Sequence, residues 1–430
     1  MKQERIAIIS GLRTPMAKAG GVFKKLQADT LGSTLIREMM MRSPVGFDEV
    51  DEVIVGNVAQ PIHAANIARV IALRAGFPEA TPAITVHRNC ASGMEALTTA
   101  TARIHAKEGK VYLCAGVESM SNIPLVYNEK MTSLFTQLAS SKTAFDRLRA
   151  LFGFRPAFLK PIVGLMSGLT DPVSGLLMGS TAEVLARDFG ISRKEQDTFS
   201  LHSHQKAQKA MESGRFAQES MPIVYDTISG KLLDFDDGIR VGQSLEKLAK
   251  LRPFFDKKNG TVTAGNSSQI TDAAAAIVVM SESEARKRGL EPLGYLSAYA
   301  YAGLEPKRMG LGPIFATQKL FKQTKLTMAD IDLLEINEAF AAQVIACQKA
   351  FDSKIFAKTH FGLDDKVGSI DPSILNVNGG AIALGHPVGM TGTRLILTML
   401  HELRNQGLQR GLSTLCIGGG QGAALLLEVS

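Results

Sequence analysis

The sequence predicts an α/β fold made of two duplicated halves with a long segment inserted between them. Short apolar runs that look like strands alternate with helical patterns along most of the chain, which is typical of sheets covered by helices. The same order of runs occurs twice. The segment from about 121 to 266 has a different pattern of residues from the two copies and separates them.

In the first half, strands are expected at 6–10, 52–56, 83–87 and 111–116. A turn with the sequence NCASGME follows the third of these runs, and after it Met94, Leu97, Thr101 and Ile104 fall at helical spacing. The pattern therefore places Cys90 on the turn where a strand enters a helix.

The second half repeats this order, with strands expected at 293–299, 331–337 and 413–419 and a helix over 393–403. When the halves are aligned, Cys114 lies opposite Cys416. The region of Cys90 then lies opposite the glycines just before His386. We therefore expect both halves to contribute to one cleft.

The inserted segment begins with a mixture of aromatic and basic residues over 130–160 and later carries a helical stretch. Ser192 and Glu195 form a capping-box pattern that predicts a helix start. Three interpretations of 130–160 stay open: a lid over a substrate channel, a surface that contacts a partner or a membrane, and plain core. A basic run then closes the segment and is suited to binding phosphates; its members are Lys247, Lys250, Arg252, Lys257 and Lys258.

Length and composition indicate a globular protein of two or three domains. The chain has 430 residues, of which 45% are hydrophobic and 21% charged, and a net charge of +7 that usually reflects a solvated lysine-rich face. Its four cysteines do not suggest a disulfide framework, and the N-terminal sequence has no signal-type apolar region. No apolar run reaches the roughly 18 residues needed to span a bilayer. We therefore expect a cytoplasmic protein.

Cys90 and Cys416 are candidate nucleophiles or acid–base groups because both lie in glycine-rich surroundings. A helix N-terminus and a nearby imidazole both favour a thiolate, and Cys90 has the first of these. The run GGGQG after Cys416 offers backbone N–H groups that can approach an oxyanion closely. His386, within NGGAIALGHPVGMTG, is the candidate imidazole; alternatively it caps a helix.

Other interpretations of these residues are weaker. The chain contains no CxxC pair, so no metal site is expected, and the GGGQG run lacks the βαβ unit that a dinucleotide loop requires. Cys114 and Cys347 are expected to be core residues. Glu118 and Glu338 are carboxylates in motif context that are expected to orient structure, and neither is assigned a chemical step. His202 and His204 are expected to be solvated.

Five motifs in order make the chain resemble the thiolase family over nearly its whole length. They are NCASG (89–93), GTVTAGNSSQITDAAAA (260–276), NEAFAAQ (337–343), GGAIALGHPVGMTG (379–392) and CIGGGQG (416–422). LEKLAKLRPFF (245–255), the stretch between Cys347 and Asn376 and the insertion over 130–175 look most like β-subunits of fatty-acid oxidation trifunctional complexes. Those β-subunits carry His where this chain has Asn337.

The resemblance implies the thiolase fold, a layered αβαβα core with a large inserted loop domain. It implies an N-terminal half over 1–121 and 267–291, a loop domain for coenzyme A binding and closure over 122–266, and a C-terminal half over 292–430.

The resemblance also implies cleavage of 3-ketoacyl-CoA by CoA, reversible as a Claisen condensation. Cys90 would form the acyl thioester, His386 would take its proton, and Cys416 would act as acid and base. Asn337 would hold a water in one oxyanion hole, together with His386. Backbone N–H groups of Cys90 and Gly418 would form the other.

Pantetheine would lie along 264–268, from Ala264 to the hydroxyl of Ser268, and Met178 would line the acyl end. The resemblance implies CoA as a co-substrate, no permanently bound cofactor and no nucleic acid. It implies a homodimer or tetramer, and a hydratase/dehydrogenase α-subunit is a candidate partner. Medium to long chains are favoured, and a short-chain acetoacetyl-CoA thiolase is the alternative. Two other functions stay open. One is another condensing enzyme of the superfamily, which the presence of Cys416 disfavours, and the other is an inactive acyl-CoA carrier or scaffold.

Overall fold

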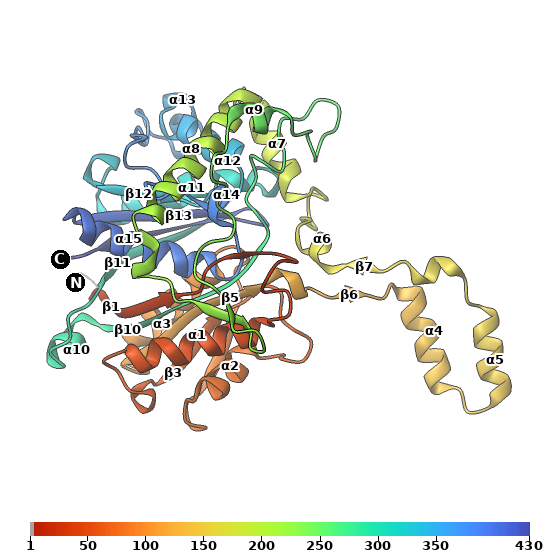
Figure 1. Cartoon of the computed structure of the whole chain (residues 1–430). Helices are drawn as coiled ribbons and strands as arrows, with labels where there is room; N and C mark the ends of the chain where they lie inside the picture. The colour runs from red at the N-terminus through yellow and green to blue at the C-terminus, as the bar shows by residue number, and fades with distance from the viewer. Residues whose placement is uncertain (1–3) are drawn as a thin grey trace.

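Two sets of β-strands, one from each half of the chain, form the centre of the molecule (Figure 1). The structure is a computed structural model that describes residues 4–430. The strands of the first half are β1 (Ile6–Arg13), β2 (Ala17–Lys18), β3 (Glu52–Gly56), β4 (Ala83–Val86), β5 (Val111–Ser119) and β10 (Thr271–Ser281). Those of the second half are β11 (Gly294–Gly303), β12 (Leu333–Ile336), β13 (Arg410–Ile417) and β14 (Gln421–Glu428).

Strand order and direction repeat between the halves. The first half runs β4, β3, β5, β10, β1, with β3 parallel to both β4 and β5 and the later pairs antiparallel. The second half runs β12, β13, β14, β11, and its one parallel pair followed by antiparallel pairs repeats the order from β3 to β1. β1 and β11 pair antiparallel and join the two sets. The prediction of two duplicated α/β halves is confirmed.

The helices of the two halves form three layers that alternate with the strands. They are α1 (Ala28–Arg42), α2 (Ile67–Ala75), α3 (Ser92–His105), α10 (Glu282–Lys287), α11 (Gly312–Thr324), α12 (Ala341–Phe351), α13 (Lys354–Phe361), α14 (Ala381–Leu384) and α15 (Thr391–Gln406). α1 and α2 cover the outer face of the first set of strands, and α11 covers that of the second. α3 and α15 contact each other and strands of both halves, so they form the middle layer.

Strands in the middle of this arrangement are apolar on both faces because helices cover both. All of β5 is buried, and β10 is buried up to its last residue. Apolar side chains accordingly gather in three main clusters, one outside each set of strands and one between them that includes Leu97 of α3 and Leu395 of α15.

The inserted segment holds the remaining helices and strands. They are β6 (Leu125–Val126), α4 (Glu129–Ser140), α5 (Ala144–Phe152), β7 (Ile162–Val163), α6 (Gly164–Gly168), α7 (Met178–Asp188), α8 (Arg193–Glu212), β8 (Ile223–Asp226), β9 (Lys231–Leu233) and α9 (Leu245–Ala249). Short 3-10 helices occur at Phe47–Glu49, Met120–Asn122, Pro156–Leu159, Arg215–Gln218, Pro306–Leu311 and Met328–Asp330.

Residues 125–163, called the arm below, project away from the body of the molecule (Figure 1). β6 and β7 pair antiparallel as a narrow ribbon, and α4 and α5 form a helical hairpin at its end. α5 has no buried residue. Of the three interpretations of 130–160, a lid over the cavity of the same chain is the one that this arrangement disfavours, because the ribbon carries these residues outward.

Three local predictions have clear outcomes. Ser192 caps α8 as expected, since its hydroxyl accepts a bond from the N–H of Glu195 at 3.2 Å. Cys114 and Cys347 are fully buried in apolar clusters, as expected. The prediction for His204 is wrong. Its side chain is buried and accepts a bond from the N–H of Arg240, because the segment after β9 covers this face of α8.

Among residues 4–430, no helix is long and apolar enough to cross a bilayer.

Candidate active site

Cys90 lies between the end of β4 and the start of α3, on the turn that the sequence predicted, and is half-buried. Ser92 holds this turn, because its hydroxyl accepts from the N–H of Arg88 at 2.9 Å and donates to the carbonyl of Asn89 at 2.7 Å. Asn89 has a φ of 43°, in the left-handed region that asparagine tolerates better than most residues. The tight turn places the thiol at the start of the helix.

His386 lies between α14 and α15, and its N–H donates to the carbonyl of Gln269 at 2.9 Å. Its ring Nδ1 lies 2.7 Å from the hydroxyl of Thr391, and that hydroxyl donates to the carbonyl of Pro387 at 3.0 Å. A hydroxyl has one proton, so Thr391 must accept from Nδ1–H. This network assigns the tautomer in which Nε2 carries the lone pair.

The imidazole of His386 is poised to accept a proton at Nε2. Burial, with a smaller contribution from the charge of Arg394, lowers the pKa of His386 to about 4. The ring is therefore neutral at physiological pH. Nε2 is buried and has no hydrogen-bond partner among residues 4–430, which leaves it free for the thiol or a ligand.

The loop of Cys90 and the loop of His386 meet because α3 and α15 approach each other closely at their N-termini. A Cβ atom at Gly93 would lie 2.6 Å from the backbone nitrogen of Thr393, and one at Gly392 would lie 2.4 Å from that of Met94. Only glycine allows this contact. The two duplicated helices thus bring their preceding loops to one place.

Cys416 is fully buried near the end of β13, and the turn to β14 follows it directly. Gly419 and Gly420 in this turn have φ values of 87° and 81°, and a Cβ at Gly420 would lie 2.3 Å from the carbonyl of Leu304. The turn thus requires glycine. The N–H of Gly418 lies close enough to the sulfur of Cys90 to lower the pKa of its thiol, so the turn reaches the first cysteine.

Burial raises the pKa values of both thiols. The N–H groups of Gly418 and of Cys90 itself oppose this increase at Cys90. At Cys416 burial is again the largest cause, and the neighbouring Cys90 adds to it. Neither thiol is therefore ionised on its own at neutral pH, and proton transfer to a base is needed before either can react.

One cavity of about 600 Å³ joins these groups. Six of the eight residues that the sequence singled out line it: Cys90, His386, Cys416, Gly418, Ser268 and Met178. Its apolar wall includes Met120, Ile123, Leu165, Leu169, Val173, Met309, Phe340 and Val388. The stretch 164–173, which follows the arm, thus covers the cavity although the arm does not.

The other two predicted residues do not line the cavity. Ala264 is exposed, four residues before Ser268. Asn337 is 1% exposed directly after β12, and both polar atoms of its amide are buried without a partner among the described residues. Buried amides are nearly always hydrogen-bonded, so this amide is available to hold a water or a ligand group.

Sequence reasoning missed two residues of this site and gave a third no chemical step. Thr391, the first of those missed, fixes the tautomer of His386, and Glu118, expected to orient structure, lines the cavity. The amide of Asn89 donates to the carbonyl of Gly418 at 2.7 Å. The only sequence signal for Asn89 was its place beside Cys90. The contacts of Thr391 and Glu118 depend on loop conformations that no local pattern specifies.

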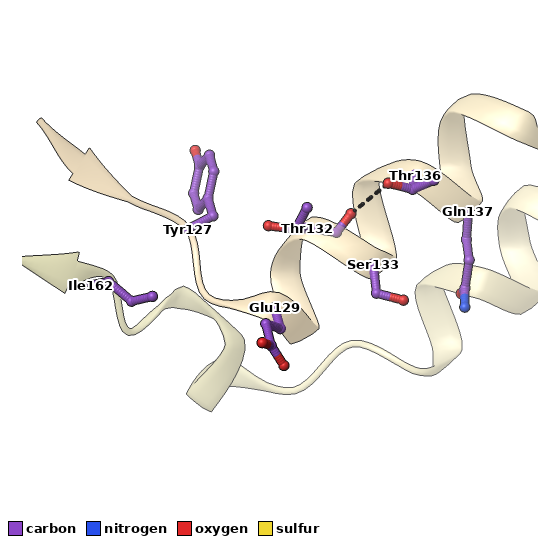
Figure 2. Close-up of a pocket in the computed structure, with 7 residues that line it drawn as sticks. All are labelled: Tyr127, Glu129, Thr132, Ser133, Thr136, Gln137 and Ile162. Atoms are coloured by element: carbon purple, nitrogen blue, oxygen red, sulfur yellow. Dashed lines mark hydrogen bonds between the residues drawn. The ribbon is translucent and has the colours of Figure 1, made fainter. Parts of the chain in front are cut away.

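A hollow on the arm lacks comparable chemistry. It lies between β7 and α4 and is lined by seven residues, among them Tyr127, Glu129, Gln137 and Ile162 (Figure 2). It has no cysteine or histidine in its wall. Within residues 4–430, no group of three His, Cys, Asp or Glu side chains is placed to hold a metal ion.

Comparison with known proteins identifies the family. Residues 6–283 match the family described as "Thiolase, N-terminal domain", and residues 290–429 match "Thiolase, C-terminal domain". The chain therefore belongs to the thiolase family, and it is an acyltransferase.

Individual relatives agree over nearly the full length. A probable acetyl-CoA acyltransferase of Staphylococcus aureus (strain COL) is 39% identical over 99% of both chains. A 3-ketoacyl-CoA thiolase of Yersinia enterocolitica is also 39% identical, over 99% of this chain and 97% of the relative.

Solved structures are equally close. The acetyl-CoA acetyltransferase of Bacillus anthracis superposes with a TM-score of 0.87 at 36% identity and 99% coverage of both chains. The human mitochondrial 3-ketoacyl-CoA thiolase in complex with CoA gives 0.86 at 34% identity, over 100% of this chain and 99% of that one. The predicted thiolase fold is confirmed.

Proposed function

We propose that the chain cleaves 3-ketoacyl-CoA with CoA to acetyl-CoA and a shortened acyl-CoA, and that the reaction runs in fatty-acid β-oxidation. The observation that carries the proposal is that Cys90, His386, Cys416 and Gly418 line one cavity with an extended apolar wall. A nucleophile, a neutral base, a second thiol and an oxyanion donor are the groups that this chemistry requires.

The first half-reaction transfers the acyl group to Cys90. Nε2 of His386 takes the thiol proton, and the thiolate adds to the 3-keto carbonyl. When this adduct collapses, the bond between C2 and C3 breaks, and the electron pair leaves as the enolate of acetyl-CoA. Cys416 gives that carbanion a proton, so acetyl-CoA departs and a thiolate remains at Cys416.

The second half-reaction restores the enzyme. The Cys416 thiolate takes the proton of the incoming CoA thiol, and the CoA sulfur attacks the acyl thioester at Cys90. Shortened acyl-CoA leaves, and the Cys90 sulfur recovers its proton from His386. Reversal of both steps gives Claisen condensation of two thioesters.

Two oxyanions form during this sequence. The N–H groups of Cys90 and Gly418 would bind the tetrahedral oxygen on the acylated cysteine, consistent with both N–H groups acting to lower the pKa of the Cys90 thiol. The imidazolium of His386, once protonated at Nε2, would donate to the enolate oxygen of the acetyl thioester. The amide of Asn337 has both polar atoms unpartnered and would hold a water there.

Coenzyme A would approach past Ser268, whose hydroxyl is half-buried in the cavity wall, and past the exposed Ala264. The basic residues of 247–258 are all exposed and would attract its phosphates. Met178 contributes to the apolar wall that would hold the acyl chain. CoA is thus a co-substrate in this proposal.

Acyl chains of medium to long length fit this wall best, since its ten or so apolar residues include several from the stretch 164–173. The alternative is a short-chain acetoacetyl-CoA thiolase. An inactive acyl-CoA carrier would need none of the reacting groups, so the presence of all of them disfavours it.

One experiment separates these readings: CoA-dependent cleavage of acetoacetyl-CoA and of 3-ketohexadecanoyl-CoA, compared by kcat/KM. Higher kcat/KM for the long substrate supports β-oxidation, and activity confined to acetoacetyl-CoA supports the short-chain alternative. Cys90→Ala must abolish both turnover and the acyl adduct seen by intact-protein mass spectrometry. Binding of acyl-CoA without turnover by the unaltered protein would instead establish the carrier.

The proposed assembly is a homodimer or tetramer, with a hydratase/dehydrogenase α-subunit as a further candidate partner. The arm is an exposed surface that could contact another subunit or a membrane. We propose that it contacts an anionic membrane. It carries six basic residues against two acidic ones. Phe145 and Phe152 on α5 are 73% and 83% exposed. An exposed apolar helix face flanked by basic residues is suited to lie in a lipid interface.

A further inference from the structure

Glu118 is a buried carboxylate in the wall of the active-site cavity that the reaction above does not use. It stands near the end of β5, is 1% exposed, and lines the same cavity as Cys90 and His386. A buried carboxylate is costly unless hydrogen bonds compensate for its lost hydration. Its partners therefore indicate what it does.

Each oxygen of Glu118 accepts two hydrogen bonds. Oε1 accepts from the side-chain amide of Asn57 at 3.1 Å and from the N–H of Ala59 at 3.0 Å. Oε2 accepts from the N–H of Val58 at 3.1 Å and from that of Gly389 at 2.9 Å. One side chain thus binds a loop of the first half and a loop of the second.

The second of these loops is the one that carries His386. Gly389 lies three residues after it, and a Cβ atom there would lie 2.8 Å from Oε2 of Glu118 and 2.8 Å from the carbonyl oxygen of Val117. A Cβ at Gly116 would lie 2.5 Å from the carbonyl oxygen of Gly389. The loop is therefore pressed against β5, and Glu118 fixes it there.

His386 is thus held on two sides. Its own N–H bond to Gln269 fixes the residue itself, and Glu118 fixes the backbone just beyond it. Cys90 lies close enough to Glu118 for the carboxylate charge to raise its pKa. The carboxylate therefore stands beside the pair that it would align.

We propose that Glu118 is a positioning residue that aligns His386 with Cys90 by hydrogen-bonding the loop 57–59 and the loop at Gly389 to each other. This inference rests on the proposed roles of Cys90 and His386. Glu118 itself gives or takes no proton in the reaction. Glu118 raises the rate only because it holds His386, the base, in the right position relative to Cys90.

The test is Glu118→Gln. Glutamine has the same size, but whichever way its amide is turned, the NH₂ group would face two N–H donors. We expect kcat for thiolysis to fall about 10²-fold, as for a displaced catalytic group, with KM for CoA within about twofold. Glu402→Gln is the matched control, because Glu402 is another mostly buried carboxylate, bonded by Arg215 and Asn378, that does not line the cavity. It should leave kcat unchanged.

A second readout does not depend on thiolase turnover. The rate of Cys90 alkylation by iodoacetamide, followed by mass spectrometry at pH 7, should fall in Glu118→Gln and in His386→Asn. Removal of the Glu118 charge by itself lowers the pKa of Cys90, but this charge is the smallest cause of the raised pKa, and displacement of the base should outweigh it. If Glu118 acts through His386, the double variant should be no slower than His386→Asn alone. Glu118→Asp, which keeps the charge but is one methylene shorter, replaces Glu118→Gln if the latter does not fold.

Failure of the positioning role and failure of the proposed function give different results. Additive losses in the double variant, or an alkylation rate in Glu118→Gln equal to that of the unaltered protein, would overturn the positioning role. Absence of thiolysis by the unaltered protein would instead overturn the proposed function. The alkylation comparison would then still decide whether Glu118 aligns the pair.

Discussion

The side-chain amide of Asn89 donates a hydrogen bond to the carbonyl of Gly418, and the two atoms are 2.7 Å apart. Asn89 belongs to the first half and directly precedes Cys90, whereas Gly418 belongs to the second half and its N–H lowers the pKa of the Cys90 thiol. The bond therefore ties the loop of Cys90 to the glycine turn across the boundary between the halves.

Asn89→Gly should slow acylation of Cys90 by about fivefold, because one hydrogen bond of roughly 1 kcal/mol that orients the glycine turn is lost. Glycine keeps the φ of 43°, so strain is not added. Burst-phase release of acetyl-CoA measures this step. The control is Lys107→Gly, at an exposed position with a φ of 62° remote from the cavity. An unchanged acylation rate in Asn89→Gly would show that the glycine turn keeps its conformation without the bond from Asn89.

Thr391→Val should lower kcat/KM by about one to two orders of magnitude, since the Nδ1–H of His386 loses its acceptor and the needed tautomer loses its support. Thr391→Ser keeps the hydroxyl and should retain most activity. Steady-state thiolysis of 3-ketohexadecanoyl-CoA compares the three proteins. Equal loss in both variants would point to packing of the methyl group instead of the hydrogen bond.

The alternation of strands and helices and its repetition were sufficient to predict both halves. The glycine-rich motifs were sufficient to predict that Cys90, His386 and Cys416 lie in one cleft, and the family resemblance added Gly418. These features are local in sequence. Thr391 was missed, and the loops that Glu118 joins could not be predicted, because both roles depend on loops from separate elements meeting. The sequence could not choose between a lid and a projecting arm for 130–160, because the same pattern of aromatic and basic residues occurs in segments that cover a cavity and in segments that project into solvent.

His204→Gln should reduce the sensitivity of the fold to acid. Burial, then the charges of Arg240 and Lys18, lower the pKa of His204 to about 4 from an ordinary value of 6.5. Between these two pKa values the unfolded chain binds a proton at His204 that the folded chain does not bind. The free energy of unfolding is therefore highest above pH 6.5 and decreases as the pH falls toward 4. Between pH 7 and 5 this loss is roughly 2 kcal/mol.

Urea unfolding at pH 7 and pH 5 measures the effect. The difference in unfolding free energy between the two pH values should be smaller in His204→Gln than in the unaltered protein. His202→Gln is the matched control on the same helix, since His202 is exposed. If both variants keep the full pH dependence, the acid sensitivity arises elsewhere, such as at His386.

The arm gives the last prediction. Phe145→Glu combined with Phe152→Glu should weaken binding to vesicles that contain phosphatidylglycerol by at least tenfold, because two exposed rings of α5 can no longer enter the lipid and negative charge is added. Thiolysis of acetoacetyl-CoA should be unchanged, since no arm residue lines the cavity. Ile228→Glu, at a 98% exposed position on the turn between β8 and β9, controls for the added charge.

Sedimentation with phosphatidylglycerol vesicles and with neutral phosphatidylcholine vesicles separates lipid charge from apolar contact. A change in oligomer size without any change in vesicle binding would assign this helix face to a second copy of the chain, and the membrane proposal would then fall.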